Sequence, residues 1–161
     1  MTLTVTPAQP DHTAALIALL EEMDRFYGAT EFDPIDVRTS QVHDALFSDT
    51  PAAYALLAWN EEQQLVGLAS YSFLWPAAGL TRSLYMKELY VAESAQRQGI
   101  GRQLMASVFD VAIKAGCSRV EWATDEDNER AQRFYQALGH EVFPSKVSYR
   151  ATGEVLQRHS P

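Results

Sequence analysis

Apolar residues recur at helical spacing in three parts of the chain, and each recurrence predicts an amphipathic helix. The first helix runs from Asp11, its expected N-cap, to about Gly28, and the second begins after Asp36. A loop over residues 28–34 joins them and is of the kind that carries specificity. The third helix ends near Gly116. In chain order, the apolar stripes are Leu16, Leu19, Leu20 and Met23; Val42, Ala45 and Leu46; and Ile100, Leu104, Val108 and Val111.

Runs rich in aromatic and β-branched residues predict strands between these helices. The runs 54–59 and 65–75 flank a polar turn and are expected to form an antiparallel hairpin, and the run 84–91 is expected to be the central strand. A further helix over 128–138 is closed by Gly139, and the polar tail 151–161 is expected to fray. Shorter strands are predicted over 2–6, 119–124, 140–143 and 146–150.

The chain of 161 residues is long enough for one domain whose core needs no disulfide or metal. Its single cysteine, Cys117, is expected to be a small apolar filler, and the four histidines have no spacing that suggests a metal site. No stretch approaches the ~20 apolar residues of a membrane span, and the N-terminus does not resemble a secretory leader. These features predict a cytoplasmic protein without a bound metal.

The charge is acidic and unevenly distributed. A net charge of −8 argues against nucleic acid as a partner, because phosphate binding requires clustered basic residues. Between positions 21 and 36, Arg25 is the only basic residue among six acidic ones. Two interpretations stand: a solvated helix end with an acidic loop, or an electrostatic funnel for a cationic amine. The acidic residues are Glu21, Glu22, Asp24, Glu31, Asp33 and Asp36.

The segment Gln96-Arg97-Gln98-Gly99-Ile100-Gly101 joins the central strand to the third helix. Its two glycines let a ligand approach the first backbone N–H groups of the helix, where the dipole is positive, so an anion such as a pyrophosphate is expected to bind there. The guanidinium groups of Arg97 and Arg102 flank the segment. Position 104 is leucine, which excludes a dinucleotide fingerprint, and a Walker sequence is absent. A plain tight turn into the helix is the alternative.

This segment resembles the acyl-CoA-binding motif of the GNAT superfamily of N-acyltransferases, Gln/Arg-x-x-Gly-x-Gly/Ala, which follows a strand ending in a Leu-x-Val triplet. Here Leu89-Tyr90-Val91 is the triplet, and residues 128–139 match the second motif, Asn-x-x-Ala-x-x-Phe-Tyr-x-x-Leu-Gly. The resemblance covers about Tyr54 to Val142. It implies an α/β (α+β) GNAT-like single domain over residues 1–161. In such a domain a mixed central sheet of about six to seven strands, with splayed parallel central strands, is flanked by about four helices.

The resemblance also implies acetyl-CoA as co-substrate, with its pantetheine arm in the gap between the splayed strands. An amine would attack the acetyl thioester directly. The backbone N–H near Val91 would stabilise the oxyanion and Tyr135 would protonate the departing thiolate, while a packing role is the alternative for Tyr135. The expected cofactor contacts are Leu89, Tyr90, Val91, Gln96, Arg97, Gln98, Gly99, Ile100, Gly101, Arg102 and Asn128, and the last of these is also expected to cap its helix.

Glu88 is the candidate general base, because an isolated charge in a central strand is rarely buried without a reason. The strand is similar to that of diamine acetyltransferases, but the Glu-Asp pair of that group corresponds to Lys87 and Glu88 here. Regular alternation places Lys87, and not Glu88, on the face of Tyr85 and Leu89. A structural ion pair between Lys87 and Glu88 is one alternative, and Glu121 or a water chain as the base is another.

The sequence therefore predicts an acetyl-CoA-dependent N-acetyltransferase that acts on a primary amine of a small molecule. Tyr27, Glu31 and Asp33 are expected to contact the acceptor, and Phe32 and Trp75 add aromatic faces for a cation. Because Lys87 would repel a second positive charge, a monoamine or amino-acid-like acceptor is favoured over a long polyamine. Acetylation of protein N-termini or lysines and a non-catalytic acyl-CoA-binding module are the alternatives. A homodimer is among the expectations.

Overall fold

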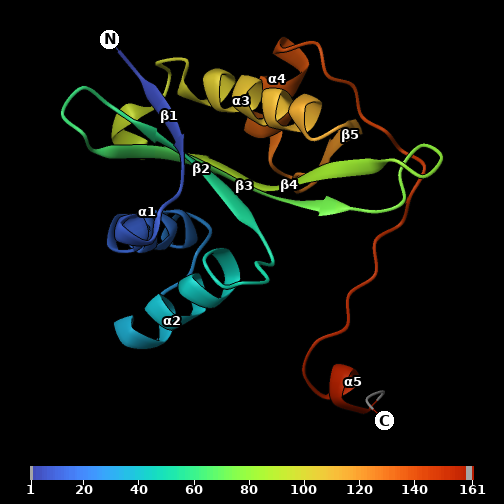
Figure 1. Cartoon of the computed structure of the whole chain (residues 1–161), viewed down its shortest axis with the longest axis horizontal. Coiled ribbons are helices and arrows are strands. Elements are labelled where there is room, and N and C mark those ends of the chain that lie inside the picture. Colours follow the sequence, from blue (N-terminus) through green and yellow to red (C-terminus); the bar gives the residue numbers. More distant parts are fainter. Residues whose placement is uncertain (1, 159–160) are drawn as a thin grey trace. The chain divides into compact units, whose positions relative to one another are not determined.

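A computed structural model describes residues 2–158 and 161 (Figure 1). The chain forms two compact units, Met1–Ala123 and Thr124–Pro161. The first unit contains a five-stranded sheet in the order β1-β2-β3-β4-β5, in which neighbours are antiparallel except for the parallel pair β4 and β5. The strands are β1 Thr4–Pro7, β2 Tyr54–Trp59, β3 Leu65–Leu74, β4 Arg82–Val91 and β5 Cys117–Trp122.

Three helices cover the sheet of the first unit from two sides. Helices α1 and α2 lie on one face and α3 lies on the other (Figure 1). Two short 3-10 turns, η1 before α1 and η2 before α3, complete the unit. The bounds are η1 Pro10–His12, α1 Thr13–Phe26, α2 Ile35–Leu46, η2 Glu93–Ala95 and α3 Ile100–Lys114.

Helix α1 buries most of its predicted stripe against the sheet, including Leu16, Leu19 and Met23. The prediction that Asp11 is its N-cap is wrong, because residues 10–12 form the 3-10 turn η1 and His12 occupies the cap position. Helix α2 is different, since none of its side chains is fully buried. It therefore rests on the sheet more loosely than α1 does.

Helix α3 approaches the sheet closely at Gly67. A Cβ atom at this position would lie 3.1 Å from Ile100 Cγ2 and 3.1 Å from Leu104 Cδ1. Only glycine fits there without moving the helix. Ile100, Leu104 and Val108 are fully buried, so the core on this side of the sheet fixes the helix that follows the glycine-rich segment.

The second unit contains helix α4, Glu129–Ala137, and the short helix α5, Gly153–Arg158. The strands predicted over 140–143 and 146–150 are wrong, because residues 140–150 have no regular secondary structure. Their apolar residues have high strand propensity, but a strand is stable only beside a hydrogen-bonded neighbour, which the described residues do not provide. The sheet consequently has five strands in the described residues and not six to seven.

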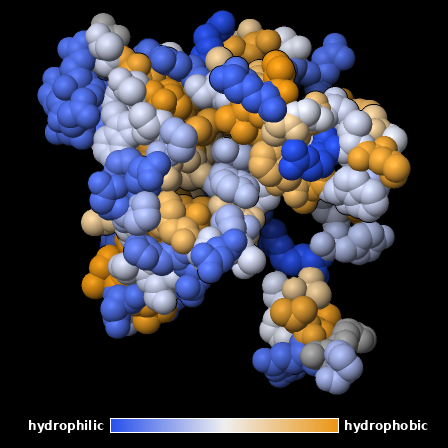
Figure 2. All heavy atoms as spheres, viewed as in Figure 1, coloured by the Kyte–Doolittle hydropathy of each residue, from blue (hydrophilic) through white to orange (hydrophobic). Residues whose placement is uncertain are grey.

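Apolar side chains are exposed in the second unit. Val142, Phe143, Val147 and Tyr149 expose between 76 and 93% of their surface. Orange atoms also mark apolar residues on the surface of α5 (Figure 2). Helix α5 falls within the tail predicted to fray, and residues 159–160 of that tail lie outside the described residues. The single domain over residues 1–161 stays a prediction.

Candidate functional site

The glycine-rich segment presents an uncapped helix N-terminus. Gly99, the N-cap of α3, has φ 80°, and no side chain forms a cap hydrogen bond there. A Cβ atom on Gly99 would meet nothing within 4 Å, so the space in front of the helix is open. Arg97 also has a positive φ, 64°, which non-glycine residues adopt rarely and often near functional sites. The first N–H groups of α3 are thus available to an anion.

Two exposed guanidinium groups flank this N-terminus. Arg97 and Arg102 form no ion pair within residues 2–158. Gln96 Nε2 donates to the Val91 carbonyl oxygen over 3.3 Å and so links the segment to the end of β4. Ile100 contributes through its backbone, because its side chain belongs to the core. The donors and charges fit the pyrophosphate of acetyl-CoA.

Strand β4 loses one neighbour halfway along its length. Its parallel pairing with β5 ends at Met86↔Trp122, whereas its pairing with β3 continues to Val91. From Lys87 to Val91 the edge of β4 that pointed to β5 has no strand partner within the first unit. Backbone groups of the Leu89–Val91 triplet are therefore placed along an open edge, as the predicted binding of a pantetheine arm requires.

A β-bulge lies at the point where the two strands separate. Glu88 is opposite Ser70 and Met86 is opposite Tyr71, so Lys87 has no partner on β3. The prediction that Lys87, and not Glu88, shares the face of Tyr85 and Leu89 is wrong. The extra residue resets the alternation, and directly opposed residues share a face.

The bulge turns Glu88 and Tyr90 to the same face as Tyr85, because these residues oppose Ser70, Leu68 and Ser72. This face is the one covered by α1 and α2. Leu89 opposes Ala69 and belongs to the other face, where α3 packs beside Gly67.

Glu121, the alternative base, lies on the same face as Glu88, since it opposes Tyr85 in the parallel pair. Its Oε1 accepts a hydrogen bond of 2.9 Å from Ser83 Oγ and lies 3.8 Å from Arg119 Nε. Ser83 is almost completely buried, with 2% of its surface exposed. Both neighbours contact the same carboxylate oxygen of Glu121, Oε1.

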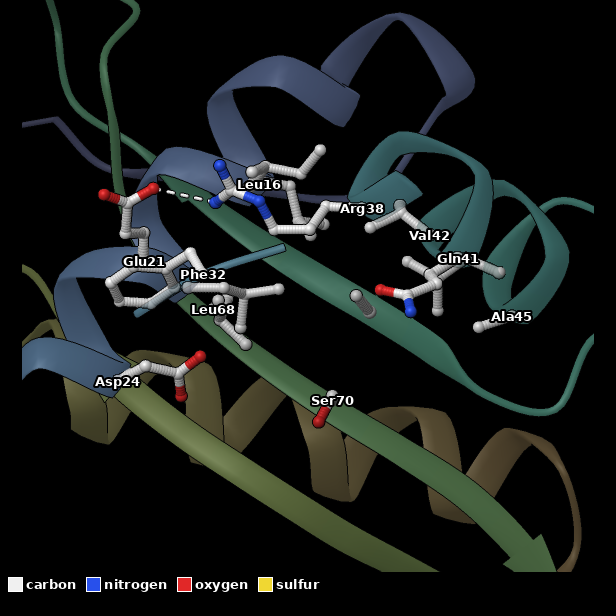
Figure 3. A pocket seen from close by; sticks show the side chains of 14 residues that line it. Leu16, Glu21, Asp24, Phe32, Arg38, Gln41, Val42, Ala45, Leu68 and Ser70 are labelled. Carbon is white, nitrogen blue, oxygen red and sulfur yellow. Dashed lines mark hydrogen bonds and ion pairs between the residues drawn. The ribbon is translucent and has the colours of Figure 1, made fainter. Parts of the chain in front are cut away.

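A cavity of about 330 Å³ opens on this face, between α1, α2 and the strands β2 and β3 (Figure 3). Its apolar walls are Leu16, Ile17 and Leu20 from α1 and Val42, Ala45 and Leu46 from α2. Ala55 and Leu68 line it from the sheet, beside Ser70. Because Ser70 pairs with Glu88, the cavity begins one strand away from the candidate base.

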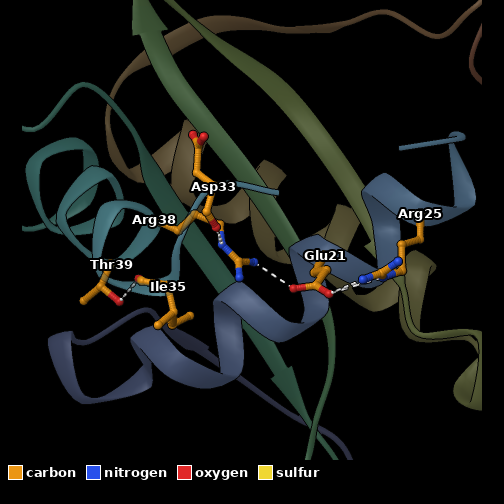
Figure 4. Close-up of polar contacts among 6 residues, drawn as sticks. All are labelled: Glu21, Arg25, Asp33, Ile35, Arg38 and Thr39. Atoms are coloured by element: carbon orange, nitrogen blue, oxygen red, sulfur yellow. Dashed lines mark hydrogen bonds and ion pairs between the residues drawn. The ribbon is translucent and has the colours of Figure 1, made fainter. Parts of the chain in front are cut away.

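The polar end of the cavity is held by one carboxylate and two arginines (Figure 4). Glu21 Oε1 accepts from Arg25 Nη2 over 2.7 Å, and Glu21 Oε2 accepts from Arg38 Nη1 over 2.7 Å. These two hydrogen bonds lower the pKa of the Glu21 carboxyl below its usual value. The guanidinium carbons of Arg25 and Arg38 lie 4.6 and 5.6 Å from the centre of the Phe32 ring. The ring that was expected to receive a substrate cation is therefore in contact with cations of the chain itself.

A second contact between α1 and β4 was not predicted. Tyr90 Oη donates a hydrogen bond of 2.7 Å to Glu22 Oε2, which also accepts from Glu93 N over 3.3 Å. Burial and the Glu22 carboxylate raise the pKa of the Tyr90 phenol. Glu22 and Tyr90 are 68 positions apart, and no local pattern in the sequence connects them.

None of the three predicted acceptor residues lines the cavity. Tyr27 is exposed just after α1, and Glu31 and Asp33 are exposed in the loop before α2. Asp33 contributes its carbonyl oxygen, which accepts from Arg38 Nε over 2.8 Å. Asp24 lines the cavity instead. The sequence predicted Asp24 only as one of six acidic residues and not as an acceptor contact, although its spacing from Ile17 and Leu20 places it on the same side of the helix.

In the second unit, Asn128 caps α4 as predicted. Its Oδ1 accepts a hydrogen bond of 3.1 Å from Ala131 N. Tyr135 is half-buried on this helix, with its ring centre 5.2 Å from that of Phe134. The cofactor contact of Asn128 and the acid role of Tyr135 stay predictions.

Among the residues that the structure describes, no three His, Cys, Asp or Glu side chains gather in a way that could hold a metal ion. None of the helices formed by these residues is long and apolar enough to cross a membrane.

Comparisons with known proteins agree with these features. Residues 16–140 match the model of the acetyltransferase (GNAT) family, and the chain belongs to this family. An L-ornithine N5-acetyltransferase of Arabidopsis thaliana is 32% identical over 52% of this chain and 36% of its own length. A D-amino-acid N-acetyltransferase of Saccharomyces cerevisiae is 32% identical over 65% of this chain and 64% of its own length. The chain thus spans about a third to just under two thirds of these relatives.

A solved structure resembles the chain over nearly its whole length. It is an integron cassette protein from the mobile metagenome of V. cholerae, with a TM-score of 0.89 and 27% identity. The similarity covers 98% of this chain and 97% of that protein.

Proposed function

We propose that the chain is an acetyl-CoA-dependent N-acetyltransferase that transfers an acetyl group to a primary amine of a small molecule. The observation that carries this proposal is the change in β4 at Lys87. There the bulge turns Glu88 to the cavity face, and the edge beyond it loses β5 and leads to the uncapped N-terminus of α3. Strand β4 therefore connects the proposed acetyl-CoA site to the proposed acceptor site. The family and the activities named for the two relatives support this function.

Acetyl-CoA, when bound, supplies an acetyl group activated as a thioester. In the proposal, backbone N–H groups of residues 98–102 and the guanidinium groups of Arg97 and Arg102 hold the pyrophosphate. The open edge of Leu89, Tyr90 and Val91 holds the pantetheine arm through backbone hydrogen bonds.

Three proton and charge steps fall to the chain during direct attack. Glu88 accepts a proton from the acceptor ammonium or amine, directly or through a water molecule. As the bond between nitrogen and the acetyl carbon forms, the Val91 N–H donates to the carbonyl oxygen and stabilises its negative charge. As the bond between carbon and sulfur breaks, Tyr135 donates a proton to sulfur.

The acceptor in this proposal is a monoamine or an amino-acid-like amine. Asp24 lines the cavity, and Glu31 and Asp33 are the sequence neighbours of the lining residue Phe32. All three carboxylates are exposed and would attract the acceptor. Glu21 and Glu22 contribute less, because both accept hydrogen bonds from the chain itself. The cytoplasmic location and the homodimer stay predictions.

The test is thiol release from acetyl-CoA with a panel of amines, combined with mass spectrometry of the products. Tyr135→Phe and Glu88→Gln should each lower turnover by roughly 10²-fold, with little change in acetyl-CoA affinity. Glu62→Gln, an exposed glutamate in the β2–β3 turn, serves as the control for Glu88. Acetylation of peptides alone would favour the protein-acetylating alternative. Acetyl-CoA binding without any product would favour a non-catalytic module.

A further inference from the structure

The cavity between α1, α2 and the sheet limits which amines fit the proposed active site. Its volume of about 330 Å³ is at the small end of the range for ligand pockets, which starts near 300 Å³. Its wall is mostly hydrocarbon, with leucine, isoleucine, valine and alanine side chains from both helices and from the sheet (Figure 3). Such a wall favours a small apolar body over a polar one.

The charges at the polar end of the cavity are largely neutralised. Glu21 accepts hydrogen bonds from both Arg25 and Arg38, and Arg38 also donates to the Asp33 carbonyl oxygen (Figure 4). Asp24 is a carboxylate of the wall that forms no ion pair among residues 2–158, and it is exposed to solvent. Away from Asp24, the apolar wall therefore offers a second positive charge little compensation for the loss of its hydration.

The cavity is placed to hold the part of the acceptor that does not react. Ser70 lines it and is paired with Glu88 across neighbouring strands, which lie about 4.8 Å apart. A primary amine beside Glu88 would therefore direct its substituent past Ser70 toward Leu68 and Ala45.

We propose that the cavity binds the hydrocarbon body of the acceptor, so that the preferred substrates are primary monoamines with an alkyl or arylalkyl chain. This inference rests on the proposed function and adds the chemical class of the acceptor. Diamines and polycationic acceptors are disfavoured because their second ammonium group would lie against an apolar wall.

The test begins with the unaltered protein and a series of n-alkylamines from ethylamine to hexylamine, with thiol release as the readout. Each buried methylene should raise kcat/KM about threefold to fourfold until the cavity is filled. 1,5-Diaminopentane has the length of hexylamine but a second ammonium in place of the terminal methyl group. It should be used at least about tenfold less efficiently than hexylamine.

A variant that fills the cavity gives an independent measurement. Ala45→Leu adds bulk inside the cavity, whereas Ala18→Leu adds the same bulk at an exposed position of α1. Ala45→Leu should lower kcat/KM for hexylamine about tenfold. It should leave kcat/KM for ethylamine and the KM for acetyl-CoA nearly unchanged. An unchanged KM for acetyl-CoA would also show that the variant is folded. Ala18→Leu should leave kcat/KM unchanged for both ethylamine and hexylamine.

The outcomes separate the two proposals. Amines that are acetylated with no dependence on chain length, or with a preference for the diamine, would overturn the cavity assignment and leave the proposed function standing. An equal effect of Ala45→Leu on short and long amines would do the same. Absence of product with every amine and peptide would overturn the proposed function and this inference with it.

Discussion

Gly99 has a positive φ and open surroundings, and it lies directly before the N-terminus of α3. Its positive φ disfavours any side chain, and its missing Cβ leaves space in front of the α3 N-terminus. Gly116 has a similar φ of 72° and equally open surroundings, but it follows α3 and does not precede it. Substitutions at Gly99 and Gly116 can therefore distinguish the effect of backbone strain from the effect of contact with a ligand.

Gly99→Ala and Gly116→Ala should each cost roughly 1 kcal/mol of folding stability, because both force alanine into the left-handed region. Only Gly99→Ala should also weaken acetyl-CoA binding, by about tenfold or more, since its methyl group enters the space proposed for the pyrophosphate. Calorimetric titration with acetyl-CoA and urea unfolding measure the two effects. Equal affinities in both variants would remove the pyrophosphate assignment.

Tyr90 gives a pH-dependent prediction. Its folded-state pKa is raised by burial and by Glu22, so the neutral phenol contributes stability that is present below the unfolded pKa near 10 and is lost as pH rises through the folded value. Unfolding free energies measured from pH ~8 to ~11 should therefore fall at the alkaline end of this range.

In Tyr90→Phe this alkaline loss should be smaller, and stability at neutral pH should be lower by about 1 kcal/mol, because the hydrogen bond to Glu22 is missing. Tyr149→Phe is the matched control, as Tyr149 exposes 93% of its surface. The same alkaline slope in both variants would show that Tyr90 is not the responsible group.

At the scale of elements, the bulge at Lys87 is the feature on which the active-site proposal depends most. The residue is exposed, so its side chain matters less than the extra position that it provides. A shortened strand in which Glu88 follows Met86 would keep both residues on their present faces, opposite Ser70 and Tyr71. It would lose the local bend that bulges produce.

Deletion of Lys87 should therefore leave a folded protein whose turnover is reduced by about tenfold or more, because a small displacement of β4 misplaces the reacting groups. Lys87→Ala retains the bulge and should retain most of the activity. Circular dichroism and thiol-release kinetics of the two variants compare fold and function. Full activity after the deletion would mean that the bulge is dispensable.

The sequence predicted the local features of this architecture and missed those that depend on distant partners. The glycine-rich segment, the Asn128 cap and the helical stripes are set by neighbours a few positions apart, and the structure contains them. The bulge depends on how β3 and β4 align, so strict alternation along β4 misplaced Lys87 and Glu88. Residues 140–150 have the composition of strands but lack a neighbouring strand in the described chain.

At the scale of the whole molecule, the net charge of −8 should assist a cationic acceptor. Exposed carboxylates act at a distance, and their attraction is screened beyond ~8 to 10 Å at physiological salt. The KM for a monoamine should rise with ionic strength, and Glu31→Gln combined with Asp33→Asn should raise it at low salt with little change in kcat. Glu62→Gln with Glu154→Gln removes two other exposed charges as a control. A KM that salt does not change would reject the funnel interpretation.

The loose packing of α2 should make this helix less stable locally than the rest of the first unit. This helix forms one wall of the cavity without burying any side chain completely, and it is tied to α1 through the Arg38 and Glu21 pair. Segments with few buried contacts open more often than the core, so amide hydrogens of α2 should exchange with deuterium sooner than those of α3. A ligand that fills the cavity would supply the missing contacts. Exchange in α2 would then slow in its presence, and selection among acceptors would be linked to the folding of the helix that surrounds them.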